Sequence, residues 1–174
     1  MSILLTRKIT LIALLAALSI VGRIYMAPIP NVQPSTVIII ITGLVFGARF
    51  GLTLALLTSI GSDFILGFGF FTLMQVIAWG AIGLISGFLA RFRTRIPIVV
   101  MACYAGLCGY LFGFLVSLNM LIGGVPSFIA YWIMGLPFDS YHAIGNFIFY
   151  IILSPILIKL LENERKKLAV KRSE

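Results

Sequence analysis

Charged side chains are scarce in this sequence. Its 174 residues include 13 Lys and Arg, five Asp and Glu and a single His, so charged residues make up only 10%. A soluble domain carries about a quarter charged residues. Hydrophobic residues make up 61% of the chain and the mean hydropathy is +1.15, which predicts an integral membrane protein. The apolar runs are long and continuous, so they predict helices and not the alternating strands of a barrel.

Groups that serve catalysis or metal binding are equally few. The sequence contains no Walker motif and no nucleophile elbow, so we predict no ATP hydrolysis by this chain and assign no catalytic residue. Cys103 and Cys108 lie within one apolar segment, where we interpret them as small packing residues and not as a disulfide or metal pair. The net charge is +8, but no aromatic-basic face accompanies it, so no nucleic-acid partner is predicted. No metal site is predicted either.

The apolar runs predict an all-α membrane protein with six transmembrane helices in one bundle. We expect a single domain over 1–174, with spans at about 8–25, 35–46, 52–66, 72–89, 97–118 and 138–161. No small-residue cleavage site follows the first apolar run, so that span is expected to be retained. Residues 26–34 hold three prolines and predict a stiff cap-like or re-entrant segment, with a plain helix connection as the alternative. The uncharged connection 119–137 is expected to lie over the mouth of the bundle as a lid.

The cations are distributed unevenly along the chain. Six spans put both ends of the chain on one side, and 12 of the 13 Lys and Arg then fall on that side, with Arg23 as the exception. The positive-inside rule makes this side, and both termini, cytoplasmic. The polar side chains at the opposite ends of the spans then gather outside. Charge and polarity are separate properties, and both favour an outward-facing pocket.

The last span carries a stripe of three polar side chains. Asp139, His142 and Asn146 are spaced i, i+3 and i+7, which places them on one face of a helix. Such groups are costly in lipid and usually face a bundle interior or a watery cavity. The alternative is a helix start at the water interface with Asp139 as an N-terminal cap, but capping does not account for Asn146, which lies two turns further on.

A second stripe lies on the fourth predicted span. Thr72, Gln75, Trp79 and Gly83 share one helix face, where an amide beside an indole and a bare glycine is suited to holding a ligand. The alternative is an interfacial tryptophan with helix–helix packing. Together with the polar groups of the neighbouring connections, the candidate substrate-binding residues are Asn31, Gln33, Asp63, Phe71, Thr72, Gln75, Trp79, Asn119, Asp139, His142 and Asn146.

Four sequence elements carry a resemblance to a known family. They are the Pro-Asn-Val-Gln-Pro loop at 30–34, the Gly-Leu-Val-Phe-Gly-Ala-Arg-Phe-Gly run at 43–51, Gln75 with Ala-Trp-Gly at 78–80, and Pro-Phe-Asp at 137–139 continuing through His142 to Asn146. On these residues nearly the whole chain resembles a substrate-binding S component of an energy-coupling factor (ECF) vitamin transporter.

The resemblance implies a multi-pass protein of a prokaryotic plasma membrane that captures a vitamin outside the cell. It also implies two kinds of partner, a membrane coupling protein and two ATP-binding subunits that drive it. The S component docks on the coupling protein and topples in the membrane to release its cargo. The family's first helix carries an Ala-x-x-x-Ala docking motif, which Ala13 and Ala17 match. Small residues at this spacing let helices approach closely, and packing inside the bundle is the alternative.

The ligand is expected as cargo and not as a permanently bound cofactor. The Asn-Val-Gln-Pro loop and the Gln-x-x-x-Trp-Gly element are most similar to S components assigned to cobalamin, while pantothenate, folate and riboflavin carriers share the architecture. Few cations lie near the expected pocket, which argues against a multi-anionic ligand. For cobalamin, His142 is a candidate to approach the cobalt, with a hydrogen bond to the ligand or to Asp139 as the alternative. The rival class is a small membrane enzyme or a structural membrane protein.

Overall fold

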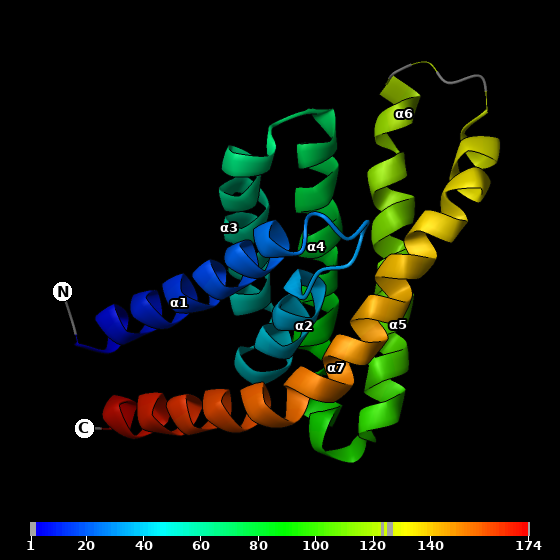
Figure 1. Ribbon diagram of the computed structural model, residues 1–174. Coiled ribbons are helices and arrows are strands. Elements are labelled where there is room, and N and C mark those ends of the chain that lie inside the picture. The colour runs from blue at the N-terminus through cyan, green and yellow to red at the C-terminus, as the bar shows by residue number, and fades with distance from the viewer. Residues whose placement is uncertain (1–2, 123, 125–126, 174) are drawn as a thin grey trace.

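The computed structural model describes residues 3–122, 124 and 127–173, with side chains up to Val170, and is helical throughout, with no strand in these ranges. This confirms the predicted all-α class. Figure 1 shows the arrangement of the elements. They are α1 (Ile3–Tyr25), α2 (Ser35–Phe46), α3 (Ala48–Leu66), α4 (Phe70–Leu89), the 3-10 helix η1 (Ala90–Arg95), α5 (Ile98–Ser117), the short α6 (Asn119–Ile122) and α7 (Phe128–Ser173).

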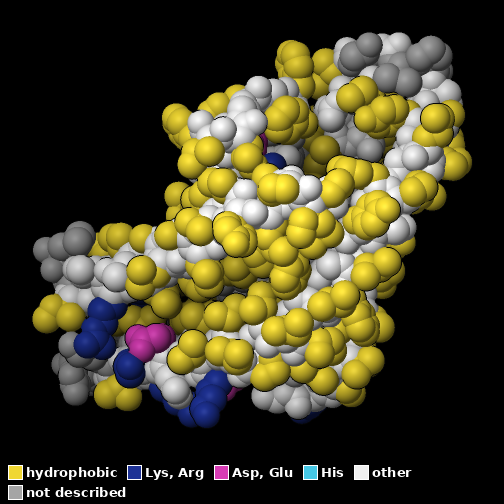
Figure 2. Space-filling model, in the orientation of Figure 1, with side chains coloured by type: hydrophobic (Ala, Val, Ile, Leu, Met, Phe, Trp, Pro, Cys, Tyr) yellow, Lys and Arg dark blue, Asp and Glu magenta, His cyan; other side chains and the backbone are white. Residues whose placement is uncertain are grey.

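Five helical stretches in the described part of the chain are long and apolar enough to cross a membrane: Ile3–Tyr25, Ala48–Leu66, Phe70–Arg95, Ile98–Ile122 and Phe128–Val170. The second predicted span, 35–46, corresponds to α2, an apolar helix of only 12 residues. Most of the visible surface is hydrophobic, as expected for a lipid-facing bundle (Figure 2).

The core of the bundle is α2. Eleven of its 12 residues are buried, and it packs against α3, α4 and α7. Pro34 precedes the helix and Gly47 ends it at φ +92°, a conformation that glycine adopts without strain. A helix that is hydrophobic on every face belongs in the interior, and α2 therefore gives the other helices a common apolar surface.

Glycines bring α3 and α4 into close contact. A Cβ atom added to Gly51 would lie 2.6 Å from the Gly83 carbonyl oxygen, and one added to Gly83 would lie 2.6 Å from the Gly51 carbonyl carbon. Gly87 lies still closer to α3, because a Cβ atom added to it would lie 2.1 Å from the Ala48 backbone nitrogen. Small residues allow such backbone approach in membrane bundles, and here they fix the spacing of the two helices that flank α2.

Helix α7 differs most from the sequence-based prediction. It begins at Phe128, ten residues before the predicted span, and contains Pro137 and Pro155. The prediction of an irregular lid up to residue 137 is therefore wrong for residues 128–137, since prolines are tolerated within membrane helices. Residues 123, 125 and 126 of that predicted lid lie outside the described residues. Figure 1 shows α7 turning sharply in its C-terminal half, the part of the helix in which Pro155 removes a backbone hydrogen bond.

The predicted inner cations lie together at one end of the molecule. Arg93 forms an ion pair with Glu162 of the α7 tail, and Arg165 donates a hydrogen bond of 3.2 Å to the Val45 carbonyl at the end of α2. The start of α1 and the end of α7 lie on this side of the bundle (Figure 1), and basic side chains gather there (Figure 2). The structure thus places both chain ends on one side, as the even number of spans predicts.

Candidate functional site

Two neighbouring hollows open at the end of the bundle opposite the basic cluster. The Arg23 hollow has a volume of about 290 Å³ and is lined mainly by α1, residues 26–33, Gln75 and α5. The Asp139 hollow has a volume of about 420 Å³ and is lined by α5, α6 and the first turns of α7. Four residues belong to both linings, Asn31, Phe112, Val116 and Phe138, so the two hollows share a wall and are considered together as one candidate site.

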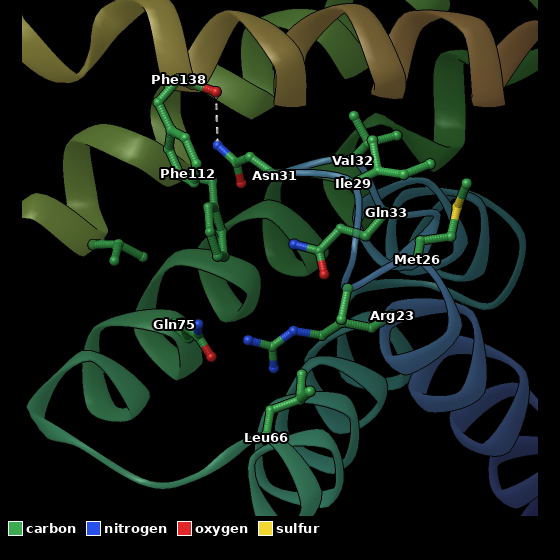
Figure 3. A pocket seen from close by; sticks show the side chains of 12 residues that line it. Arg23, Met26, Ile29, Asn31, Val32, Gln33, Leu66, Gln75, Phe112 and Phe138 are labelled. Atoms are coloured by element: carbon green, nitrogen blue, oxygen red, sulfur yellow. Dashed lines mark hydrogen bonds between the residues drawn. The ribbon is translucent and has the colours of Figure 1, made fainter.

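Five of the predicted substrate-binding residues line these hollows. Gln33 and Gln75 face the Arg23 hollow, Asn119 and Asp139 the Asp139 hollow, and Asn31 both. In Figure 3 the side chains of Gln33 and Gln75 point into the space that the Arg23 guanidinium also faces. The buried Gln75 Oε1 has no hydrogen-bond partner within the described part of the chain, which leaves it free to accept a hydrogen bond from a ligand.

The proline-rich segment before α2 is fixed by Asn31. This residue has φ +56°, a left-handed conformation that asparagine tolerates better than most residues. Its side-chain Nδ2 donates to the Phe138 carbonyl at 3.0 Å (Figure 3), and its own carbonyl oxygen accepts a hydrogen bond from His142. The segment is thereby tied to α7 and forms a rigid wall between the two hollows.

Arg23 is the one cation that the topology argument placed on the outer side, and it lines the Arg23 hollow. Its Nη1 donates to Asp63 Oδ1 at 2.7 Å and to the Ser62 hydroxyl, and its guanidinium carbon lies 5.1 Å from the centroid of the Trp79 ring. The Arg23 side chain is 11% exposed and that of Asp63 is fully buried. Since the two charges neutralise each other, the hollow offers directed donors without a strong net charge.

A buried chain of hydrogen bonds lies beneath the hollows. Trp79 Nε1 donates to Thr36 Oγ1 at 2.9 Å, and Thr36 Oγ1 lies 2.9 Å from His142 Nε2. His142 Nδ1 lies 2.9 Å from the Asn31 carbonyl oxygen, which can only accept, so Nδ1 carries the proton and Nε2 accepts from Thr36. The chain connects α4, α2, α7 and the segment before α2.

Three predicted site residues therefore lie behind the wall of the hollows and not at it. Trp79, His142 and Asn146 are all completely buried. Both ring nitrogens of His142 have hydrogen-bond partners within the protein, so neither nitrogen is available to a cobalt ion in this arrangement. Both amide atoms of Asn146 have no hydrogen-bond partner among the residues described.

The remaining predicted residues contribute in different ways. Asp139 is 5% exposed, and a Cβ atom at Gly113 would overlap its carboxyl group, so the glycine makes room for the carboxylate. Thr72 Oγ1 accepts a hydrogen bond from the Gly69 backbone at 3.2 Å and caps α4. Phe71 is 37% exposed next to it, and neither of these two residues lines the hollows.

Several lining residues were not predicted from the sequence. They are mostly apolar, and their patterns did not differ from those of ordinary lipid-facing or core residues. Phe112 is the most central of them, because it lines both hollows and lies 4.8 Å from the Trp79 ring and 5.1 Å from the His142 ring by centroid distance. The others include Met26, Ile29, Leu66, Val116, Tyr131, Met134 and Phe138.

Comparison with known proteins decides the family. A family model described as "ECF transporter, substrate-specific component" matches residues 7–154. The chain belongs to this family. No match was found among curated proteins or among solved structures. As an S component, the protein is the substrate-binding membrane subunit of its transporter, and members of the family associate with an ECF module that carries the ATPases.

The two alanines of the predicted docking motif are on the surface of this S component. Ala13 and Ala17 are exposed on α1, whereas Ala16 and Ser19 are buried against the bundle. Packing within the bundle, which was the alternative explanation for the motif, therefore does not account for Ala13 and Ala17. They lie beside exposed Leu14 and Leu18 on a face of α1 that is free in the described part of the chain.

Proposed function

We propose that this S component captures a vitamin in the joined Arg23 and Asp139 hollows, with cobalamin as the first candidate cargo. The observation that carries the proposal is the convergence of two amide side chains, those of Gln33 and Gln75, with the Arg23 guanidinium in a largely apolar hollow that Asn31 also lines. Apolar walls with a few directed polar groups are typical of small-molecule sites. The hollows lie at the end of the bundle opposite the basic cluster, which corresponds to the outer side if the cations are cytoplasmic.

The chemistry of the lining supports an uncharged ligand rich in amides. Arg23 is neutralised by Asp63, so a ligand with several negative charges would meet little net positive charge. Cobalamin carries several side-chain amides that match the amide groups of Gln33 and Gln75. Its corrin ring is larger than either hollow alone, so we expect it to occupy both and to displace the first turns of α7 outward.

Ligand capture is tested by purifying the protein from cells grown with cobalamin and recording the absorption spectrum and native mass of the purified sample. We expect stoichiometric corrinoid to co-elute. Substitution Gln75→Ala should weaken binding by about tenfold, because a ligand amide would lose its buried acceptor. Thr94→Ala is the matched control, since Thr94 is exposed in η1 at the other end of the molecule.

Titration with pantothenate, folate and riboflavin in the same assay separates the cargo from the mode of capture. Binding of one of these vitamins that depends on Gln75 would replace cobalamin as the cargo but keep the site. If every vitamin binds the Gln75→Ala variant as tightly as the unmodified protein, the proposed site is wrong.

We further propose that the exposed Ala13–Ala17 face of α1 docks on the membrane coupling protein of the ECF module, with both termini in the cytoplasm of a prokaryotic cell. Ala13→Trp is expected to abolish co-purification with the coupling protein, because an indole would prevent close helix approach. Ala130→Trp, an equally large change at an exposed position of α7, should leave the complex intact. A complex that survives Ala13→Trp would contradict the docking proposal.

A further inference from the structure

A third hollow lies at the basic end of the bundle, far from the candidate vitamin site. The Arg93 hollow has a volume of about 310 Å³ and lies between η1, the start of α5 and the part of α7 around Pro155. Its lining includes the apolar residues Ile98, Met101 and Ile158 and the basic residues Arg93 and Lys159. None of these residues takes part in the proposed capture of a vitamin.

Two buried polar groups of this hollow lack partners. Ser154 is 1% exposed, and its Oγ atom has no hydrogen-bond partner within the ranges that the structure describes. The same holds for Arg93 Nη1, although the guanidinium is anchored through its Nη2 atom to Glu162. Buried groups without a hydrogen-bond partner are costly to leave unsatisfied, so both are placed to bind a polar group that enters the hollow.

The start of α5 adds a third source of positive potential. The helix begins at Ile98 after Pro97, and no side chain caps its first turn. Ile98 itself lines the hollow. Free N–H groups and the helix dipole favour an anion at such a terminus. Arg93 and Lys159 supply two positive charges against the single carboxylate of Glu162, so the hollow as a whole favours an anionic group.

The geometry points to an anionic phospholipid as the occupant, and we propose that the Arg93 hollow binds its headgroup phosphate. The phosphate would accept hydrogen bonds from Arg93 and Ser154 and lie close to the Lys159 ammonium, while an acyl chain follows Ile98 and Met101. Ile98 is 43% exposed, and the adjoining Val99 and Val100 are 55% and 54% exposed, so the apolar wall continues onto the surface that faces lipid tails. A free phosphate ion would leave this apolar wall without a partner.

Native mass spectrometry of the whole protein tests the proposal. The protein is delipidated in detergent and titrated with phosphatidylglycerol or with phosphatidylcholine of the same acyl chains. We expect one phosphatidylglycerol to be retained per chain, and Lys159→Gln and Arg93→Gln each to weaken its retention by about tenfold, which corresponds to one charge-assisted hydrogen bond. Lys159→Gln leaves the Arg93–Glu162 ion pair in place, so its effect does not depend on that contact.

The controls are Arg95→Gln and Lys166→Gln, which remove the same charges from exposed positions outside the hollow. Equal retention of phosphatidylcholine and phosphatidylglycerol would overturn the proposal, as would equal losses in the control variants. Displacement of the lipid by millimolar inorganic phosphate, with no loss in equimolar chloride, would assign the site to free phosphate and likewise overturn it. The cargo assay with cobalamin is a separate readout, so failure of either proposal leaves the other standing.

Discussion

Replacement of Asp63 by Ala should lower the free energy of unfolding by about 3–5 kcal/mol, the largest stability effect that we expect from a single substitution in this protein. The change would remove the carboxylate partner of the Arg23 side chain, which is only 11% exposed. Removing one member of a buried ion pair costs a free energy of this size. Thermal unfolding in detergent measures the loss. Tryptophan fluorescence is a suitable signal, because Trp79 lies directly against the guanidinium.

A paired substitution separates stability from ligand binding. Arg23→Met combined with Asp63→Leu replaces the two charges with apolar side chains of similar size, which is often neutral or stabilising for a buried pair. We expect the double variant to unfold near the temperature of the unmodified protein but to bind its ligand at least tenfold more weakly, because the hollow loses its guanidinium donors. A loss below about 1 kcal/mol for Asp63→Ala alone would show that the ion pair does not hold α1 to α3.

Replacement of His142 by Phe should loosen the wall between the two hollows. The phenyl ring keeps the contact with Phe112 but removes both hydrogen bonds of the imidazole. Thr36 Oγ1 would lose its acceptor and the Asn31 carbonyl its donor, so we expect a loss of about 2–4 kcal/mol from two buried groups left unpaired. Ligand affinity should fall by tenfold or more, since Asn31 and Gln33 belong to the segment that the histidine fixes.

Hydrogen exchange of residues 26–34 gives the specific readout for this substitution. Amide protection in that segment should drop in His142→Phe, because the local opening of a segment reports the contacts that hold it. Ser140→Ala is the control on the same helix; its hydroxyl bonds to Tyr110 and to the Leu136 carbonyl, neither of which touches the segment. Unchanged exchange in His142→Phe would mean that other contacts hold residues 26–34 in place.

The sequence predicted best those features that local chemistry determines. The bounds of α2 agree with the predicted span 35–46, because Pro34 and Gly47 mark both ends. The start of α7 did not follow from its sequence. The three glycines and two prolines of the connection 119–137 indicated a loop, whereas the structure continues the helix from Phe128 through Pro137. Tertiary packing against α5 outweighs the local preference there.

The candidate site could be predicted in its polar members but not in their roles. Asn31, Gln33 and Gln75 stand out as amides in an apolar chain, and they do line a common hollow. His142 and Trp79 stand out equally, yet both are buried structural partners of Thr36. These hydrogen bonds join residues 36, 79 and 142, which are far apart in the sequence and meet only in the folded bundle. Phe112 gave no signal, because a phenylalanine that lines a hollow has the same sequence pattern as one that packs in the core.

The shortness of α2 has a consequence for how deeply cargo can sit. Twelve residues of helix extend about 18 Å, whereas the hydrocarbon core of a bilayer is about 30 Å thick. Its N-terminal end follows Asn31 and Gln33, which line the Arg23 hollow. If the other end of α2 lies at the inner boundary of the hydrocarbon, about 12 Å of the hydrocarbon thickness remains on the side of the hollow. A captured molecule would therefore lie below the lipid headgroups, with only the short helix α2 between it and the opposite face of the membrane.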